Sequence, residues 1–252
     1  MSAIEDDPRD AITELLKLFK LPTASTEMVK RLVDAGYENA LDVVREVLEA
    51  EHESRVERRV QRLLYASHLP PAKTFDTFTF DRLPLPLSRQ LRELAKGEFV
   101  DRATNVLAFG LPGTGKSHAM CSLGHALVQA GRSVYFVPTF RLVQELLIAK
   151  RELALPRLLR KLDKFDVLIL DDIGYVQQAA DEIEVLFTLL AERYERRSVI
   201  ITSNLVFSQW DRIFQNPMTT AAAIDRLVHH SVILEFNVPS YRTEGRDNGA
   251  ET

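Results

Sequence analysis

The strongest constraint on the fold of this chain is segment 110–117, which reads Gly-Leu-Pro-Gly-Thr-Gly-Lys-Ser. This spacing of glycines, lysine and hydroxyl is the P-loop pattern, a phosphate-binding turn that joins a strand to a helix. An apolar run precedes it at 105–109, and a proline-free stretch with helix-compatible spacing follows at 117–129. We therefore expect a phosphate site between a strand and a helix. The alternative is a glycine-rich turn that binds no ligand.

The residue types in this segment suit a nucleoside triphosphate and its magnesium ion. Glycines allow the backbone to turn tightly and to point its amide groups at an anion. Lys116 can reach the β- and γ-phosphates, and the Ser117 hydroxyl can hold Mg²⁺. The predicted contacts to ATP or ADP are Gly110, Pro112, Gly113, Thr114, Gly115, Lys116, Ser117 and His118.

Length and composition allow one α/β domain with a smaller appendage. The chain has 252 residues, 46% of them hydrophobic, and its apolar runs are far too short to span a bilayer. The acidic N-terminus has no apolar signal core, and a single cysteine, Cys121, excludes a disulfide framework. We expect a cytoplasmic protein without a membrane partner, in which Cys121 fills the core. The net charge of −4 leaves nucleic-acid contacts to local basic patches.

Residues 1–72 are predicted to form a separate helical domain that binds DNA or a partner. Apolar residues at helical spacing indicate helices at 11–19, 28–33, 41–48 and 51–67. Pro22 is expected to break the first helix, and Ser25 or Thr26 is expected to cap the second, which Gly36 ends. Two consecutive prolines close this block, so the domain boundary is placed near residue 72.

The last of these helices carries an arginine-rich stretch that permits two interpretations. Arg55, Arg58, Arg59 and Arg62 are interspersed with glutamates such as Glu51. Ion pairs between residues four apart, such as Glu51 with Arg55, would give a solvated helix. The arginines could instead contact a phosphate backbone, so Arg55, Arg58 and Arg59 are candidate DNA-binding residues.

From residue 73 onward the pattern is typical of an α/β domain. A non-helical connector with three phenylalanines, at 74–80, is expected to pack onto a neighbouring domain and to lead into a helix at 87–97. Apolar runs predict strands at 105–109, 134–137, 167–170, 199–202 and 232–236, separated by helices at 117–129, 140–150, 152–164, 180–194 and 221–230. This alternation predicts a parallel five-stranded sheet flanked by helices, with ligands beyond the carboxyl ends of the strands.

Three polar residues at predicted strand ends complete a candidate site for ATP hydrolysis. Asp171 and Asp172 follow four apolar residues, which is the Walker B pattern. Asp171 would hold the Mg²⁺ shell, and Asp172 would orient or deprotonate the attacking water unless it only caps a turn. Asn204 ends the next strand, where its amide could bind the γ-phosphate and the water or serve only as a turn residue.

Two arginines further along the chain are candidates for phosphate contacts. Arg226 lies in the Asp-Arg-Leu of 225–227, and Arg242 lies in the Ser-Tyr-Arg of 240–242. Arginine suits bidentate contact with phosphate oxygens and can be supplied by a second subunit. Spacing alone leaves an intramolecular ion pair as the alternative for both.

Taken together, the P-loop, the Asp-Asp-Ile-Gly of 171–174, the Ile-Thr-Ser-Asn of 201–204 and the two arginine motifs resemble the IstB/DnaC-like branch of AAA+ ATPases. The resemblance covers an ATPase domain at 73–242 and extends to the N-terminal block, and 243–252 is expected to be a disordered tail. It implies a bacterial protein in which Asn204 is the γ-phosphate sensor. It also implies that Arg226 completes a neighbour's site, so that ATP assembles a homo-oligomer on DNA.

The chain departs from the general AAA+ pattern at two places. Asp172 stands where glutamate is usual, and its shorter side chain is expected to lie farther from the water and to slow hydrolysis. Only ten residues follow Arg242, too few for the helical C-terminal lid domain of most AAA+ proteins. Arg242 is therefore the candidate substitute for a lid arginine.

A basic segment between the second and third predicted strands is a second candidate for DNA contact. Six basic residues face two acids between 150 and 164, and the cations are Lys150, Arg151, Arg157, Arg160, Lys161 and Lys164. Phosphate contacts there would be independent of sequence and sensitive to salt, whereas the alternative is a solubilising face. In initiator-type members of the family this region faces the central channel of the assembly, which favours DNA.

Together with these residues, the resemblance implies an ATPase that oligomerises on duplex DNA with ATP and helps a transposase select or use its target. The main alternative is a loader that binds single-stranded DNA and a replicative helicase, because both roles use the same core. A small-molecule kinase is a more distant alternative, because the sequence offers no candidate for an acceptor pocket or for a lid over the phosphates.

Overall fold

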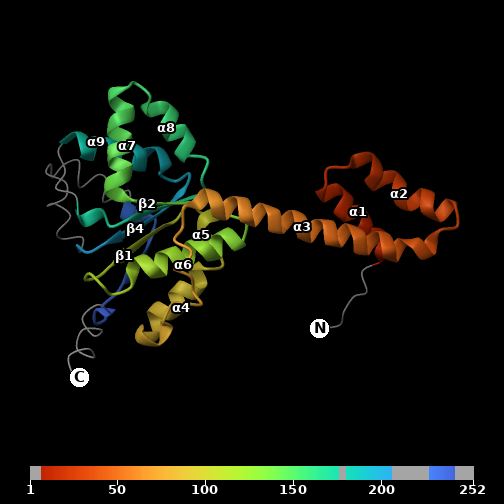
Figure 1. Cartoon of the computed structure of the whole chain (residues 1–252), viewed down its shortest axis with the longest axis horizontal. Coiled ribbons are helices and arrows are strands. Elements are labelled where there is room, and N and C mark those ends of the chain that lie inside the picture. Colours follow the sequence, from red (N-terminus) through yellow and green to blue (C-terminus); the bar gives the residue numbers. More distant parts are fainter. Residues whose placement is uncertain (1–6, 176–179, 206–226, 242–252) are drawn as a thin grey trace. The chain divides into compact units, whose positions relative to one another are not determined.

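The computed structural model describes residues 7–175, 180–205 and 227–241 and contains two compact units, 1–61 and 62–252 (Figure 1). The predicted boundary near residue 72 follows helix α3 (Leu41–Ser67), whereas the structure divides within that helix. The end of α3 belongs to the second unit, and the chain directly after the helix packs there. Leu69, just beyond the helix, is buried and lies against Gly124.

The N-terminal unit contains α1 (Pro8–Leu18), α2 (Pro22–Asp34), a short 3₁₀ helix (Glu38–Ala40) and most of α3. Ile12 and Leu16 of α1 form a small core with Leu41 of α3, and apolar side chains of α2 pack against it. The three-element core is small, as expected for about sixty residues.

Two helix boundaries in this unit differ from the prediction. Pro22 begins α2 instead of lying between two helices, because a proline suits the first helical turn, where no N–H donor is needed. Ser25 therefore lies inside α2 and donates its hydroxyl to the Pro22 carbonyl at 2.8 Å instead of capping the helix. Gly36 follows the helix with φ of 77°, as predicted for a helix end.

Helix α3 is continuous over 41–67, where the sequence predicts two helices. The predicted helices at 41–48 and 51–67 leave a break at 49–50, where the apolar periodicity stops and a charged stretch begins. That stretch contains no glycine or proline, and glutamate and alanine are good helix formers, so nothing in it stops the helix.

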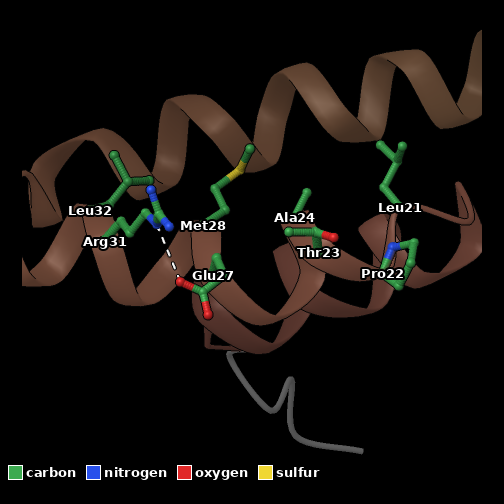
Figure 2. Close-up of a pocket in the computed structure, with 8 residues that line it drawn as sticks. All are labelled: Leu21, Pro22, Thr23, Ala24, Glu27, Met28, Arg31 and Leu32. Atoms are coloured by element: carbon green, nitrogen blue, oxygen red, sulfur yellow. Dashed lines mark hydrogen bonds and ion pairs between the residues drawn. The ribbon is translucent and has the colours of Figure 1, made fainter.

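Helix α2 carries a largely apolar groove of about 660 Å³ (Figure 2). Its lining residues are Leu21, Pro22, Thr23, Ala24, Glu27, Met28, Arg31 and Leu32. Glu27 and Arg31 form an ion pair of 3.2 Å at its edge. The groove therefore presents apolar side chains beside one neutralised pair of charges.

The second unit is built on a parallel sheet of β1 (Asn105–Phe109), β2 (Val134–Pro138), β3 (Val167–Asp171), β4 (Ser198–Ser203) and β5 (Ser231–Glu235). The strand order is β2-β3-β4-β1-β5, which confirms the predicted five-stranded parallel sheet. Phe109 pairs with Ser203 of β4 and with Glu235 of β5. The carboxyl ends of β1 and β4 therefore lie side by side, where ligands bind in such sheets.

Helices cover both faces of this sheet (Figure 1). Helices α4 (Leu85–Leu94), α5 (Glu98–Asp101) and α6 (Lys116–Gln129) lie on one side. Helices α7 (Thr139–Arg151), α8 (Leu155–Leu162) and α9 (Ala180–Arg193) lie on the other. A large buried apolar cluster forms there between side chains such as Leu170 of β3, Leu142 of α7 and Leu186 of α9. No helix in the described part of the chain is long and apolar enough to cross a membrane.

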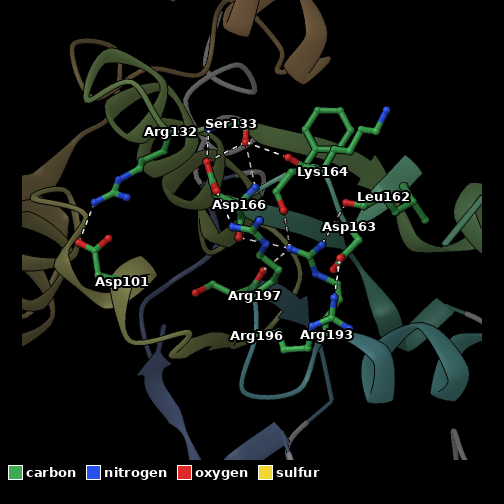
Figure 3. A network of polar contacts seen from close by, with 12 residues as sticks. Asp101, Arg132, Ser133, Leu162, Asp163, Lys164, Asp166, Arg193, Arg196 and Arg197 are labelled. Atoms are coloured by element: carbon green, nitrogen blue, oxygen red, sulfur yellow. Dashed lines mark hydrogen bonds and ion pairs between the residues drawn. The ribbon is translucent and has the colours of Figure 1, made fainter. Parts of the chain in front are cut away.

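A buried arginine at the end of α9 organises the turn between α8 and β3 (Figure 3). Arg193 is 1% exposed and donates to the carbonyl oxygens of Leu162 at 3.0 Å, Phe165 at 2.9 Å and Ser198 at 3.1 Å. Burial lowers the pKa of Arg193 to about 10, so the guanidinium is still charged at neutral pH. The backbone carbonyl oxygens therefore compensate the buried positive charge, and the guanidinium supplies these oxygens with hydrogen-bond donors.

Candidate nucleotide site

The P-loop lies between β1 and α6, as the sequence predicts. Gly110, Gly113 and Gly115 have positive φ angles of 153°, 83° and 93°. A Cβ atom at Gly110 would lie 2.6 Å from the carbonyl oxygen of Phe236, so only glycine fits there. The segment after β5 thus approaches the loop closely enough to define its shape.

Lys116 is held on the inner side of the loop. Its Nζ donates to the carbonyl oxygens of Gly110 at 2.6 Å and Leu111 at 2.8 Å. The hydroxyl of Thr114 donates to the same Leu111 carbonyl at 2.9 Å, and both side chains are buried, whereas Pro112 is exposed. The positive charge of Lys116 therefore lies beside the backbone N–H groups at the N-terminus of α6, an arrangement that suits a phosphate group.

A pocket of about 330 Å³ adjoins the loop, and the connector before α4 forms one of its walls. The lining residues are Lys73, Thr77, Phe78, Thr79, Gly113, Gly115, Lys116, Ser117, His118 and Tyr241. Phe75, Phe78 and Phe80 pack on one another, and Phe78 also lies edge-on to His118 with centroids 5.2 Å apart. Aromatic and polar walls beside a phosphate site suit the base and sugar of a nucleotide.

His118 ties the connector to α6. Its Nε2 lies 3.1 Å from the Thr77 hydroxyl and 3.3 Å from the Thr74 carbonyl oxygen. Burial lowers the pKa of His118, which favours the neutral ring. The predicted nucleotide contact therefore lines the pocket and also fixes the pocket wall.

Tyr241 is a site residue that the sequence reasoning missed. Its N–H donates to the Gly113 carbonyl at 2.9 Å, and its hydroxyl donates to the Thr79 carbonyl at 3.3 Å. The guanidinium of Arg82 lies 4.0 Å from the centroid of its ring. The signal in the sequence is the Ser-Tyr-Arg motif at 240–242, whose arginine alone suggests a phosphate contact.

The Walker B acids lie at the carboxyl end of β3, and a threonine of β4 contacts both. Thr202 Oγ1 donates to Asp171 Oδ1 at 2.7 Å and accepts the N–H of Asp172 at 2.7 Å. Thr139 donates its hydroxyl to the main-chain carbonyl of Asp171 at 3.0 Å. Asp172 has φ of 60°, in the left-handed region, so the chain turns sharply directly after the strand.

Asn204 follows β4 and packs against Gly174, in the turn after the Walker B acids. A Cβ atom at Gly174 would overlap the Asn204 amide oxygen, which explains why glycine stands there. Asn204 Oδ1 is buried and has no hydrogen-bond partner within the described structure. An unsatisfied buried acceptor is unfavourable, so a hydrogen bond from a ligand group or a water would stabilise this oxygen.

The oxygen donors at this edge of the sheet fit a magnesium ion. Ser117 opens the first turn of α6, and Asp171 ends β3, so a hydroxyl and a carboxylate are available. The described residues contain no group of three or more acids, histidines and cysteines that could cage a metal. Magnesium is usually held by one or two protein oxygens together with substrate phosphates, so the donor set fits it.

Arg226 and Arg242 lie outside the described residues. Their predicted roles, as a finger in a neighbour's site and as a substitute lid arginine, therefore stay predictions. The tail predicted at 243–252 also lies outside the described part of the chain.

The basic segment at 150–164 divides into two parts. Lys150 is ion-paired with Glu184 at 2.7 Å, which raises the pKa of that lysine. The α8 cations, defined as Arg157, Arg160 and Lys161, are exposed, and no acid in the described ranges pairs with them. Arg151 and Lys164 are exposed too, and Asp163, one of the two acids in the segment, pairs with Arg196 instead.

The arginines of α3 match the solvated-helix interpretation better than the phosphate-contact one. Arg55 Nε donates to Glu51 at 2.6 Å, and its guanidinium lies 4.1 Å from the ring centroid of Phe19. Arg58 reaches the same carboxylate at 3.4 Å, and these arginines lower the pKa of Glu51. Arg59 is exposed. A DNA-binding role for Arg55, Arg58 and Arg59 stays a prediction.

Comparison with known proteins identifies close sequence relatives. A family model described as IstB-like ATP binding protein matches residues 11–249. An insertion sequence ATP-binding protein of Sinorhizobium fredii is 49% identical over 196 residues, covering 77% of this chain and 66% of that relative. The corresponding protein of insertion sequence IS21 from Pseudomonas aeruginosa is 40% identical over 195 residues, covering 77% of this chain and 74% of the relative.

Solved structures with low sequence identity share the fold. The DnaC helicase loader aligns with a TM-score of 0.55 and 18% identity, covering 66% of this chain and 97% of the loader chain. The replication initiator DnaA, bound to AMPPCP and single-stranded DNA, aligns with a TM-score of 0.57 and 15% identity, covering 69% of this chain and 52% of the initiator. These likenesses confirm the predicted AAA+ fold.

Proposed function

This chain belongs to the family of IstB-like ATP-binding proteins, and from this premise we propose that it is a magnesium-dependent ATPase that acts on duplex DNA for a transposase. The observation that carries the proposal is the meeting of four groups at the carboxyl ends of β1, β3 and β4. These groups are the P-loop lysine, the two Walker B acids and the amide oxygen of Asn204, which has no partner among the described residues.

Each group has a distinct task in phosphoryl transfer to water. Lys116 and the P-loop amides bind the phosphates, and Ser117 and Asp171 would hold the magnesium ion, which neutralises charge on the phosphate oxygens when bound. Asp172 orients the water and accepts its proton. Asn204 Oδ1 accepts a hydrogen bond from the water, and this bond fixes the direction of attack.

Phosphate release with two variants tests this assignment. Asp172→Asn should keep nucleotide affinity but lower the turnover rate by about 100-fold, because the proton acceptor is lost. Lys116→Ala should weaken ATP binding itself. An unaltered chain that releases no phosphate from ATP, with or without duplex DNA, would refute the proposed activity.

ATP would assemble several copies through Arg226 acting in the site of a neighbour. This role rests on the family resemblance, and particle mass in the ultracentrifuge tests it. The chain should form larger assemblies with ATP and duplex DNA, and Arg226→Ala should lower turnover in those assemblies. A monomer under every condition would contradict the role of Arg226.

Duplex DNA is proposed to bind at the α8 cations. These side chains are exposed, and no acidic residue in the described part of the chain forms an ion pair with them. Arg157→Glu, Arg160→Glu and Lys161→Glu together should weaken DNA binding. They should also lower the slope of log affinity against log salt by about 2.7, since each phosphate contact contributes about 0.9. A control with the same charge change is Arg89→Glu, Lys96→Glu and Arg102→Glu, on exposed positions near α4 and α5.

The two triple variants decide whether the effect is local. Equal loss of affinity in both would mean that net charge, not the α8 cations, governs binding. The names of the relatives, which place them in insertion sequences, support a transposase as the partner. A strong preference for single-stranded over duplex DNA in the presence of ATP would instead assign the chain to helicase loading.

A further inference from the structure

Thr202 has no part in the reaction outlined above, yet its side chain contacts both Walker B acids. It lies on β4, is 1% exposed and precedes Asn204 by two residues. Its hydroxyl uses its single proton on Asp171 Oδ1 and a lone pair on the N–H of Asp172, both at 2.7 Å. An apolar side chain would fill such a buried strand position equally well, so the hydroxyl requires an explanation.

The first bond orients the carboxylate of Asp171. The terminal torsion of an aspartate is broad, so a carboxylate without a partner turns freely. Thr202 holds Oδ1 with a charge-assisted hydrogen bond, which is stronger than a bond between neutral groups. The other oxygen, Oδ2, is thereby directed to a fixed place.

The second bond supports the turn that directs Asp172. The φ angle of 60° at Asp172 is uncommon for residues with a Cβ atom and is adopted by aspartate mainly where local hydrogen bonds support it. The bond from its N–H to Thr202 Oγ1 supplies such support. The backbone nitrogen and the Cβ atom of Asp172 are both bonded to its Cα atom. A hydrogen bond that holds the N–H group therefore also restricts the direction in which the side chain leaves the backbone.

We propose that Thr202 is a positioning residue that sets the two Walker B carboxylates for the metal shell and for the attacking water. The inference rests on the proposed ATPase function. Thr139 offers an internal comparison, because it holds only the main-chain carbonyl of Asp171. Thr202, in contrast to Thr139, contacts the carboxylate of Asp171 and the N–H of Asp172.

Metal affinity, measured apart from turnover, tests this role. The full chain is mixed with a non-hydrolysable ATP analogue and titrated with Mn²⁺, and free Mn²⁺ is followed by electron paramagnetic resonance. Thr202→Ala should weaken Mn²⁺ binding by about tenfold or more, the range expected when a hydrogen bond to a charged group is lost. Thr202→Ser, which differs from alanine by one oxygen, should stay within about threefold of the unaltered chain.

Two further measurements separate positioning from general damage. Affinity for the analogue in EDTA should be the same in all variants, because the P-loop binds the phosphates without Thr202. Thr139→Val should change the Mn²⁺ affinity by less than about threefold. If Thr202→Ala does not fold, Thr202→Val fills the same space and carries the same expectation.

The outcomes are distinguishable. Equal Mn²⁺ affinity for the alanine and serine variants, or an equally large loss in Thr139→Val, would overturn the role of Thr202. An unaltered chain that binds Mn²⁺ with the analogue but never releases phosphate would refute the proposed ATPase. In that case the Mn²⁺ titration would still decide whether Thr202 sets the metal shell.

Discussion

Replacing Gly174 with alanine is expected to slow ATP hydrolysis strongly while leaving nucleotide binding intact. The new Cβ atom would overlap the Asn204 amide oxygen and would lie 3.2 Å from Asn204 Cγ and 3.3 Å from Leu205 Cγ. The backbone of Gly174 lies outside the left-handed region, so alanine adds no strain of its own. The side chain of Asn204 must therefore yield, by about 1 Å.

A shift of that size at a group that aligns the attack costs roughly 100-fold in rate. The assay is single-turnover phosphate release, with nucleotide affinity measured separately by fluorescence. Affinity should be unchanged, because the pocket beside the P-loop contains neither Gly174 nor Asn204.

A double-mutant cycle checks the cause. Asn204→Ala should show a similar loss of rate, and adding Gly174→Ala to it should cost nothing more, because the overlapped amide is gone. Hydrolysis within about threefold of the unaltered chain in Gly174→Ala would refute the reasoning. A further fall in the double variant would refute it too, because the glycine would then act through some other contact.

Three further predictions concern buried or half-buried side chains. Burial lowers the pKa of His118 from its usual 6.5, so protonation of the ring favours the unfolded chain. The free energy of unfolding, measured in urea titrations, should therefore fall as the pH drops below about 6.5. The variant His118→Gln should lose this part of the pH dependence. Burial raises the pKa of the Cys121 thiol to about 12, so mass spectrometry should find it unmodified by iodoacetamide until the chain is denatured. Arg193→Ala removes the donor to several buried carbonyls and should lower the free energy of unfolding by about 3 kcal/mol in urea, whereas a loss below about 1 kcal/mol would mean that water replaces the guanidinium.

The parts of the fold with a local cause were predictable from the sequence. Each strand of the sheet is a short apolar run, and the P-loop is a contiguous pattern, so their places were confirmed. The predictions of helix boundaries were wrong where the same residue type can either end a helix or lie within one. Pro22 fits a helix breaker by pattern but begins α2, and the break predicted at 49–50 lies inside the continuous helix α3.

The contacts that complete the site were not predictable, because they join residues far apart in the chain. Thr202, Gly174 and Tyr241 acquire their partners only through the strand order β2-β3-β4-β1-β5, which no single segment encodes. Nothing in the sequence around Arg193 indicates that this arginine is buried. Metal, DNA and partner roles stay predictions because no contact among the described residues tests them.

The contact between the P-loop and the segment after β5 has a consequence for synthesis of the chain on the ribosome. Gly110 faces the Phe236 carbonyl, and Gly113 accepts the N–H of Tyr241. The loop is translated long before these partners leave the ribosome, so a nascent chain that carries the whole P-loop still lacks two of the contacts that shape it. ATP is therefore expected to bind tightly only after β5 has joined the sheet beside β1.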